Sequence, residues 1–127
     1  MAQSKGRHAL VIEDEMLIAM EIEQQLEELG FASVDVADTP SGALASATAR
    51  RPDLITADAR IIGGTGIEAV QAITKALGPV PVVYITGNRE LLASPENDVI
   101  IDKPMGPCDL ARAWRRLCAG RPADAAL

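Results

Sequence analysis

The stretch ITADARIIGGTG, Ile55–Gly66, joins an apolar strand pattern to one acidic residue and then to several glycines. The strand pattern begins at Asp53, so Asp58 stands at its carboxyl end, and the glycines that follow loosen the backbone beside it. A carboxylate at the end of a buried strand can be solvated, bind a metal ion or act as a nucleophile. The rest of the sequence has to decide among these three roles.

The chain on both sides of this stretch alternates between strand and helix patterns. Strands are predicted over His8–Glu13, Ser33–Ala37, Asp53–Asp58, Val80–Thr86 and Val99–Asp102. Helices are predicted over Met16–Leu29, from Pro40 to the residues before Pro52, over Gly66–Leu77, over a short part of Asn88–Asn97 and over Pro107–Cys118. This order predicts an α/β fold in which one parallel five-stranded sheet has helices on both faces.

Size and charge restrict the function. The chain has 127 residues, the size of one ordinary domain, and a net charge of −6. A negative balance disfavours binding to nucleic acid, because contacts with phosphates need a basic surface. Arg112, Arg115 and Arg116 form the nearest approach to a basic patch, and we interpret them as a solvated or protein-binding helix face.

Cysteine and histidine usage excludes several kinds of site. Ten residues separate Cys108 and Cys118, about 15 Å along one helix, which is too far for a disulfide. Free thiols are typical of a reducing compartment, and no apolar run is long enough to span a membrane, so we expect a cytoplasmic protein. His8 is the only histidine, which argues against a zinc cluster or a histidine-based triad.

The predicted strand ends bring polar side chains to one edge of the sheet. Ligands of such folds bind outside the carboxyl ends of the strands, where this chain carries Glu13, Asp14, Asp58, Thr86 and Lys103. Neighbouring carboxylates repel each other unless a cation lies between them, and oxygen ligands suit Mg²⁺. An ammonium and a hydroxyl group suit the oxygens of a phosphoryl group, and a carboxylate can attack phosphorus. We therefore predict a phosphoryl-accepting site with Asp58 as its nucleophile.

Four motifs resemble those of bacterial response-regulator receiver domains of the CheY-like type. They are LVIEDE, PDLITADARIIGGTGIEA, VVYITG and IIDKPM, which begin at Leu10, Pro52, Val82 and Ile100. Together they follow the family order along nearly the whole chain. The resemblance implies a flavodoxin-like (βα)₅ fold with strand order 2-1-3-4-5.

The resemblance also implies a magnesium site and a phosphorylation site. Asp58 would be the phosphoacceptor and, with Asp14, a direct metal ligand, while Glu13 would act through water and Arg60 through its backbone carbonyl. Lys103 would pair with the phosphoryl group and precede a cis peptide bond. Thr86 would bind the phosphoryl group after the conformational switch.

Departures from the family pattern concern the switch. The position of the usual switch aromatic is occupied by Ile100, and the segment from Thr86 to Lys103 is short. Tyr84 and Gly87 flank Thr86 in a way that resembles the "FATGUY" subgroup of receivers. We expect the switch to run through Thr86 and the backbone after it.

These observations predict a stand-alone receiver domain over residues 1–120, with a loose tail over 121–127. It would accept a phosphoryl group on Asp58 from a histidine kinase or histidine phosphotransfer protein, with Mg²⁺, and then change its protein-binding surface. We expect a monomer or weak homodimer with a possible downstream protein partner, and no enzyme apart from possible self-dephosphorylation.

Three other interpretations compete with this prediction. An aspartate-nucleophile Mg²⁺ phosphatase would carry its nucleophile after the first strand and a cap domain, and it would leave Asp58 unexplained. A flavodoxin-like FMN binder would need a phosphate loop where Glu13, Asp14 and Glu15 stand. A pseudo-receiver that binds its partner without phosphorylation stays open, although the site residues are all present.

Overall fold

The computed structural model describes residues 6–92, 95–96 and 98–119, and it contains the predicted parallel sheet. The strand order is β2-β1-β3-β6-β7, which is 2-1-3-4-5 when only the strands of this sheet are counted, so the predicted topology is confirmed. The strands are β1 (Arg7–Ile12), β2 (Phe31–Ala37), β3 (Leu54–Ala57), β6 (Val82–Thr86) and β7 (Val99–Asp102).

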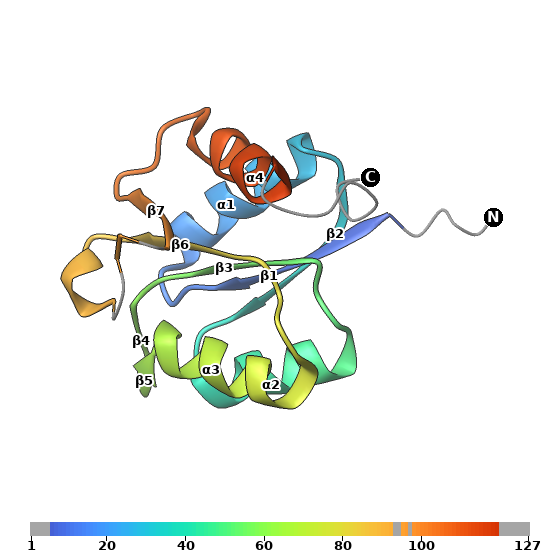
Figure 1. Ribbon diagram of the computed structural model, residues 1–127, viewed down its shortest axis with the longest axis vertical. Helices are drawn as coiled ribbons and strands as arrows, with labels where there is room; N and C mark the ends of the chain where they lie inside the picture. Colours follow the sequence, from blue (N-terminus) through green and yellow to red (C-terminus); the bar gives the residue numbers. More distant parts are fainter. Residues whose placement is uncertain (1–5, 93–94, 97, 120–127) are drawn as a thin grey trace.

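The helices lie in two layers, one on each face of the sheet (Figure 1). They are α1 (Met16–Glu28), α2 (Pro40–Ala49), α3 (Gly66–Leu77) and α4 (Asp109–Ala119), with a 3₁₀ helix η2 (Arg89–Leu91) between β6 and β7. Helices α1 and α4 cover one face, and α2 and α3 cover the other. This is the arrangement expected when each parallel strand is followed by a helical crossover.

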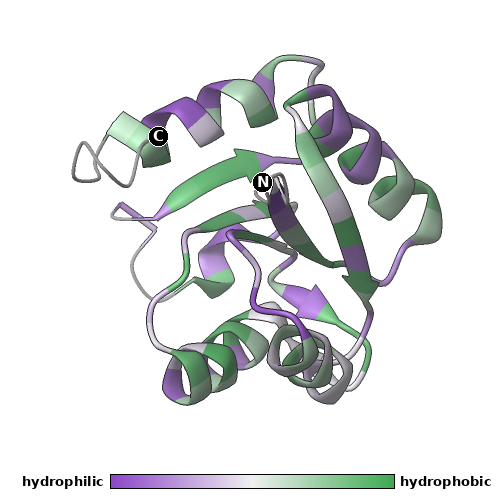
Figure 2. Ribbon diagram, turned by 90° about the vertical axis from the view of Figure 1, so that its right-hand side faces the viewer, coloured by the Kyte–Doolittle hydropathy of each residue, from purple (hydrophilic) through white to green (hydrophobic). Residues whose placement is uncertain are grey.

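Strand β1 shows how the sequence supplies two cores at once. Leu10 and Ile12 pack with residues of α2 and α3, whereas Ala9 and Val11 pack with residues of α1 and α4. Successive side chains of a strand point to opposite faces, so a run of consecutive apolar residues serves both layers. Figure 2 shows hydrophobic residues in the central strands, with helices on both sides of the sheet.

Local signals explain where α3 begins and ends. The Thr65 side chain accepts the backbone N–H of Glu68, and the Glu68 side chain accepts that of Thr65, which forms a capping box. Gly78 follows the last helical residue with φ of +87°, a conformation that favours glycine. The observed bounds of this helix match the predicted ones.

Two segments differ from the sequence prediction. The stretch between Asp58 and α3, expected to be a loop, contains a two-stranded hairpin, β4 (Arg60–Ile61) with β5 (Gly64–Thr65). Each strand has two residues, too few for a recognisable hydrophobic period, and Gly63 makes the turn with φ of +79°. The helix expected within Asn88–Asn97 is only the single 3₁₀ turn η2 among the described residues.

The C-terminal part is largely as predicted. Helix α4 begins at Asp109, so Cys108 lies just before it while Cys118 lies within it, and both thiols are free. The predicted tail at 121–127 lies outside the described residues. Among the described residues, no helix is both long and apolar enough to cross a membrane.

Candidate functional site

The five predicted site residues stand at the carboxyl ends of four neighbouring strands. Glu13 and Asp14 follow β1, Asp58 follows β3, Thr86 ends β6 and Lys103 follows β7. Backbone hydrogen bonds hold these ends in register. The N–H of Asp58 donates to the carbonyl of Ile12 at 3.0 Å, and that of Lys103 donates to the carbonyl of Thr86 at 3.2 Å.

The Lys103 ammonium links two of the acidic residues. Its Nζ lies 2.7 Å from Asp58 Oδ2 and 3.0 Å from Glu13 Oε1. Burial favours the neutral amine, but hydrogen bonds to Asp58 and Glu13 outweigh it and raise the pKa of Lys103. Lys103 is therefore a fixed positive charge beside the predicted nucleophile.

Three carboxylates form a cluster that fits a hard divalent cation. Single oxygens of Glu13, Asp14 and Asp58 all lie within 4.8 Å of one another. Asp14 is accessible to solvent, whereas Glu13 is only 2% exposed, and burial raises the pKa of Glu13 even though Lys103 opposes this. An all-oxygen set with one open side fits Mg²⁺, which usually keeps several waters.

The backbone around Asp58 is closely packed. The Asp58 side chain is buried, and its Oδ1 lies 3.4 Å from the backbone N–H of Arg60. A Cβ atom added at Gly66 would overlap the backbone carbonyl oxygen of Asp58. Glycine is therefore required at this position so that α3 can begin directly against the strand that carries Asp58.

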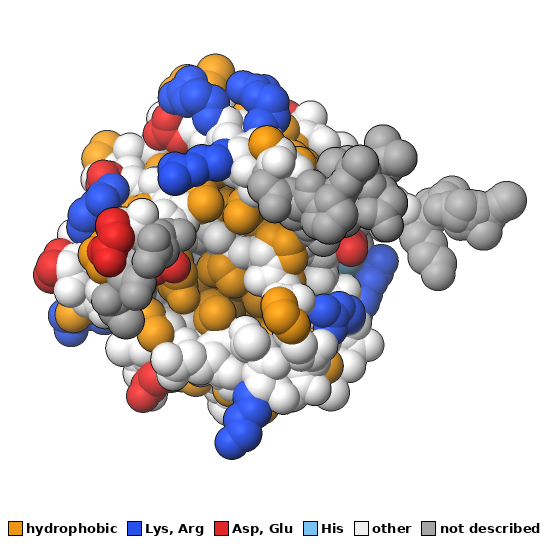
Figure 3. Space-filling model, in the orientation of Figure 1, with side chains coloured by type: hydrophobic (Ala, Val, Ile, Leu, Met, Phe, Trp, Pro, Cys, Tyr) orange, Lys and Arg blue, Asp and Glu red, His pale blue; other side chains and the backbone are white. Residues whose placement is uncertain are grey.

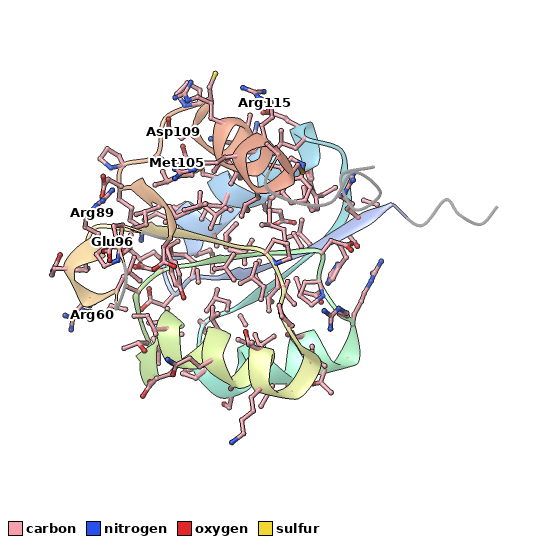
Figure 4. The ribbon with its side chains drawn as sticks, viewed as in Figure 1. Arg60, Arg89, Glu96, Met105, Asp109 and Arg115 are labelled. Carbon is pink, nitrogen blue, oxygen red and sulfur yellow. The ribbon has the colours of Figure 1, made fainter. Side chains whose placement is uncertain are left out.

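Thr86 and Arg60 occupy different surroundings. Thr86 is fully buried, and its Oγ1 accepts the backbone N–H of Asn88 at 3.0 Å. Arg60 is exposed on β4, and its side chain extends away from the sheet (Figure 4). The contact of its carbonyl with a metal ion stays a prediction. The cis peptide bond between Lys103 and Pro104, which the family resemblance implies, is present.

Sequence reasoning missed an ion pair at the rim of the site. Arg89 Nε lies 3.0 Å from Asp102 Oδ1, and Arg89 Nη2 lies 2.9 Å from Asp102 Oδ2. The hydrogen bonds raise the pKa of Arg89 and lower that of Asp102. Opposite charges 13 residues apart carry no signal in one sequence, because only the turn η2 and the end of β7 bring them together.

Sequence reasoning also missed an exposed apolar patch beside the carboxylates. Met16, Leu17 and Met20 of α1 are 76%, 80% and 57% exposed, and Val36 of β2 is 46% exposed. We name these four residues the α1 patch. Except for Leu17 they line a hollow of about 350 Å³ that also includes Glu13 and Asp14. The helical period indicated the buried side of α1, and its exposed apolar residues gave no separate signal.

A second hollow of about 350 Å³ lies between β7 and α4. It is lined by Val99, Ile100, Ile101, Asp102, Asp109, Arg112, Ala113 and Arg116. On the face shown in Figure 3, hydrophobic side chains gather between the two helix layers and basic side chains surround them. Asp102 lines this hollow and Lys103, the next residue, belongs to the site, so the two regions are joined by consecutive residues of the chain.

Known proteins with similar sequences and structures are signalling regulators. The phyllosphere-induced regulator PhyR of Methylorubrum extorquens is 36% identical over 116 residues, which is 87% of this chain. The chain spans only 43% of that protein's length. The solution structure of the PhyR response regulator REC domain from Erythrobacter litoralis matches with a TM-score of 0.82 at 27% identity, covering 93% of this chain and 94% of that one.

Another similar structure contains a metal ion. The crystal structure of a receiver domain of a sensor histidine kinase from Pseudomonas aeruginosa, with magnesium coordinated in its active-site cleft, has a TM-score of 0.73. It is 28% identical and covers 88% of this chain and 98% of that one. A family model described as the response regulator receiver domain matches residues 9–115. With the observed strand order and the acidic edge of the sheet, the match shows that this chain belongs to the response regulator receiver domain family.

Proposed function

We propose that the protein accepts a phosphoryl group on Asp58 from a histidine kinase or a histidine phosphotransfer protein, in a reaction that requires Mg²⁺. The observation that carries this proposal is the contact between Lys103 Nζ and Asp58 Oδ2 at 2.7 Å, beside a cluster of three carboxylates. A buried carboxylate held next to an ammonium and a cation site is arranged for reaction with an anionic donor.

The chemistry follows from the groups at the sheet edge. A carboxylate oxygen of Asp58 attacks the phosphorus of a phosphohistidine. The P–O bond forms as the P–N bond breaks, and the departing imidazole takes up a proton from solvent. Lys103 supplies a positive charge for a phosphoryl oxygen as the phosphoryl group moves to Asp58. Glu13, Asp14, Asp58 and the carbonyl of Arg60 would hold the magnesium ion, which neutralises phosphoryl oxygens when it is bound.

The α1 patch supports a protein donor. Met16, Leu17 and Met20 form exposed apolar surface next to Asp14, on the accessible side of the carboxylate cluster. Clustered exposed apolar side chains of this kind mark protein interaction sites. A helical donor that covers the patch would bring its histidine close to Asp58.

The response would leave the site through the segment after Thr86 and through the end of β7. The end of β7 lines the hollow between β7 and α4, in which Arg112 and Arg116 lie beside apolar side chains, and the segment after Thr86 is linked to it by the pair of Arg89 with Asp102. We propose that a downstream protein binds this surface. The chain would then serve as a binding module that phosphorylation switches, and not as an enzyme with a separate substrate.

Asp58→Asn tests the proposed function. The variant should take no radiolabel from a phosphorylated histidine kinase or from a small-molecule phosphodonor with Mg²⁺, whereas the parent protein is labelled. Asp38→Asn serves as the matched control, because Asp38 is an exposed carboxylate that also borders the site. Labelling that survives in Asp58→Asn would move the acceptor elsewhere. A parent protein that no donor labels, yet which binds a partner, would favour the pseudo-receiver.

A further inference from the structure

The ion pair between Arg89 and Asp102 has a fixed geometry although it lies in solvent. Two parallel hydrogen bonds of 3.0 and 2.9 Å join the guanidinium to the carboxylate. The side chains are 49% and 62% exposed. Figure 4 shows Arg89 on the connection between β6 and β7, on the same side of the molecule as Arg60. A bidentate pair of this kind restrains orientation as well as distance.

Each partner is close in sequence to a residue of the phosphoryl site. Asp102 immediately precedes Lys103, and Arg89 follows Thr86 by three residues. The pair therefore connects the segment that begins at Thr86 to the segment that carries the ammonium. Backbone pairing of Thr86 with Asp102 and the bond from Lys103 N–H to the Thr86 carbonyl join the same two strand ends.

Backbone pairing of β6 with β7 holds the two strand ends, and the ion pair adds a side-chain link on the solvent side. Gly87 is exposed, and a Cβ atom placed there would meet no atom within 4 Å. η2 is one turn long and ends at Leu91. Among the described residues, Arg89 makes the only side-chain ion pair between η2 and β7. The pair therefore adds a side-chain restraint on the backbone just before Lys103, beside the backbone pairing of Thr86 with Asp102.

The energy of the pair argues for positioning over stability. Exposed ion pairs contribute little to folding stability. The Lys103 side chain, however, reaches two carboxylates at once, 2.7 and 3.0 Å from its Nζ. In group transfer, a misplacement of about 1 Å can slow the reaction by roughly a hundredfold. A small restraint at Asp102 can therefore affect the rate of phosphoryl transfer more than it affects the fold.

We propose that Arg89 and Asp102 are positioning residues for phosphoryl transfer: their pairing fixes the backbone before Lys103, so that its ammonium stays on Asp58 and Glu13. The inference rests on the proposed function of Asp58. The inference assigns a role to Arg89 and Asp102, which are not among the residues that would contact the phosphoryl group.

Variants of both partners test the inference by kinetics. The set consists of Arg89→Gln, Asp102→Asn and the exchanged double variant Arg89→Asp/Asp102→Arg. Arg51→Gln is the control, because Arg51 is an exposed arginine that donates hydrogen bonds to the backbone carbonyls of Leu77 and Pro79, outside the site and outside the hollow between β7 and α4. Labelling rates are measured over a range of acetyl phosphate concentrations at saturating Mg²⁺, and the unfolding temperature of each variant is measured alongside.

Arg89→Gln and Asp102→Asn should lower the maximal labelling rate roughly three- to tenfold, with little change in half-saturating donor concentration or unfolding temperature. The exchanged variant should recover at least half of the loss, and Arg51→Gln should match the parent. Single variants that label as fast as Arg51→Gln would overturn the inference. An exchanged variant as slow as the single ones, or a rate loss that follows the unfolding temperature, would also overturn it.

A second measurement reads the position of Lys103 without phosphorylation. In ¹⁵N-labelled protein the Lys103 ammonium, held by Asp58 and Glu13, should give a side-chain NMR signal protected from water. Arg89→Gln should weaken that signal through faster exchange, and Arg51→Gln should leave it unchanged. An unchanged signal in Arg89→Gln would refute the positioning role. If the parent protein is never labelled but Arg89→Gln still weakens the signal, the proposed function is refuted and the positioning role of the pair is retained.

Discussion

The Lys103 ammonium lies 2.7 Å from the Asp58 carboxylate, although 45 residues separate them in the chain. The same ammonium is 3.0 Å from Glu13, so one positive charge bridges the ends of β1, β3 and β7. One ammonium thus compensates the charge of only one of the two buried carboxylates, which leaves net negative charge at the site. Phosphorylation of Asp58 would convert that carboxylate into an acyl phosphate and would give the lysine a phosphoryl oxygen as its partner.

Asp14 should contribute more to magnesium binding than Glu13. Asp14 is on the accessible side of the cluster, whereas the Oε2 of Glu13 accepts the N–H of Glu15 at 3.1 Å and its Oε1 contacts Lys103. Glu13→Gln should weaken Mg²⁺ binding roughly tenfold, as expected for an indirect ligand, and Asp14→Asn should weaken it further. Calorimetric titration of both variants measures the order. Equal losses, or a larger loss for Glu13→Gln, would contradict it.

Gly66→Ala should destabilise the protein by about 1–3 kcal/mol, because the new methyl group would meet the backbone carbonyl of Asp58 and neither side can move easily. Gly87→Ala is the control, since nothing lies within 4 Å of the added atom. Urea unfolding of both variants gives the two free energies. Equal stabilities would show that the junction of β3 and α3 is looser than the structure indicates.

The strand order and the site residues were accessible from the sequence for different reasons. Strand β3 and helix α3 show clear hydrophobic periods, and acidic residues directly follow two strands. The residues at the carboxyl edge of the sheet could therefore be predicted from the sequence. The hairpin of β4 and β5 and the pair of Arg89 with Asp102 could not be found in this way. Both depend on how the backbone turns between elements, and neither leaves a periodic pattern.

Tyr84 should report the alkaline behaviour of the fold. Burial, together with the negative charge of Asp98, raises the pKa of Tyr84 from 10.0 to about 12. A raised pKa in the folded state stabilises the protein below pH 10, and that contribution is lost as the pH rises through about 12. Tyr84 is the only tyrosine, so tyrosinate absorbance follows this residue alone.

The native protein should titrate near pH 12 and the urea-unfolded protein near pH 10. Tyr84→Phe should lose less unfolding free energy than the parent between these pH values. A native titration near the ordinary value would show that the hydroxyl group is solvated.

Leu17→Glu should slow phosphotransfer from a protein donor by roughly tenfold or more, the effect of removing a central apolar contact from an interface. Labelling by acetyl phosphate should stay unchanged, because a small donor does not cover the α1 patch. Ile62→Glu is the matched control: Ile62 is 54% exposed but lies in the turn between β4 and β5, outside the patch. If Leu17→Glu slows labelling by the same factor with the protein donor and with acetyl phosphate, the substitution disturbs the phosphoryl-accepting site and not the docking of the donor.

The switch should run through Thr86 and the backbone after it. The Thr86 hydroxyl accepts the N–H of Asn88 at 3.0 Å, so turning it towards a phosphoryl group has to release that bond and move the segment from Gly87 onwards. Ile100 is half-buried and β-branched, which keeps its side chain stiff, and it has no hydroxyl group that could change partners.

Backbone NMR with Mg²⁺ and beryllofluoride, a phosphoryl mimic, should show shift changes across 87–92. Thr86→Ala should bind the mimic and lose most of these changes, whereas Ile100→Val should keep them. A silent segment 87–92 in the parent protein, or changes that disappear in Ile100→Val, would mean that the signal leaves the site by another route.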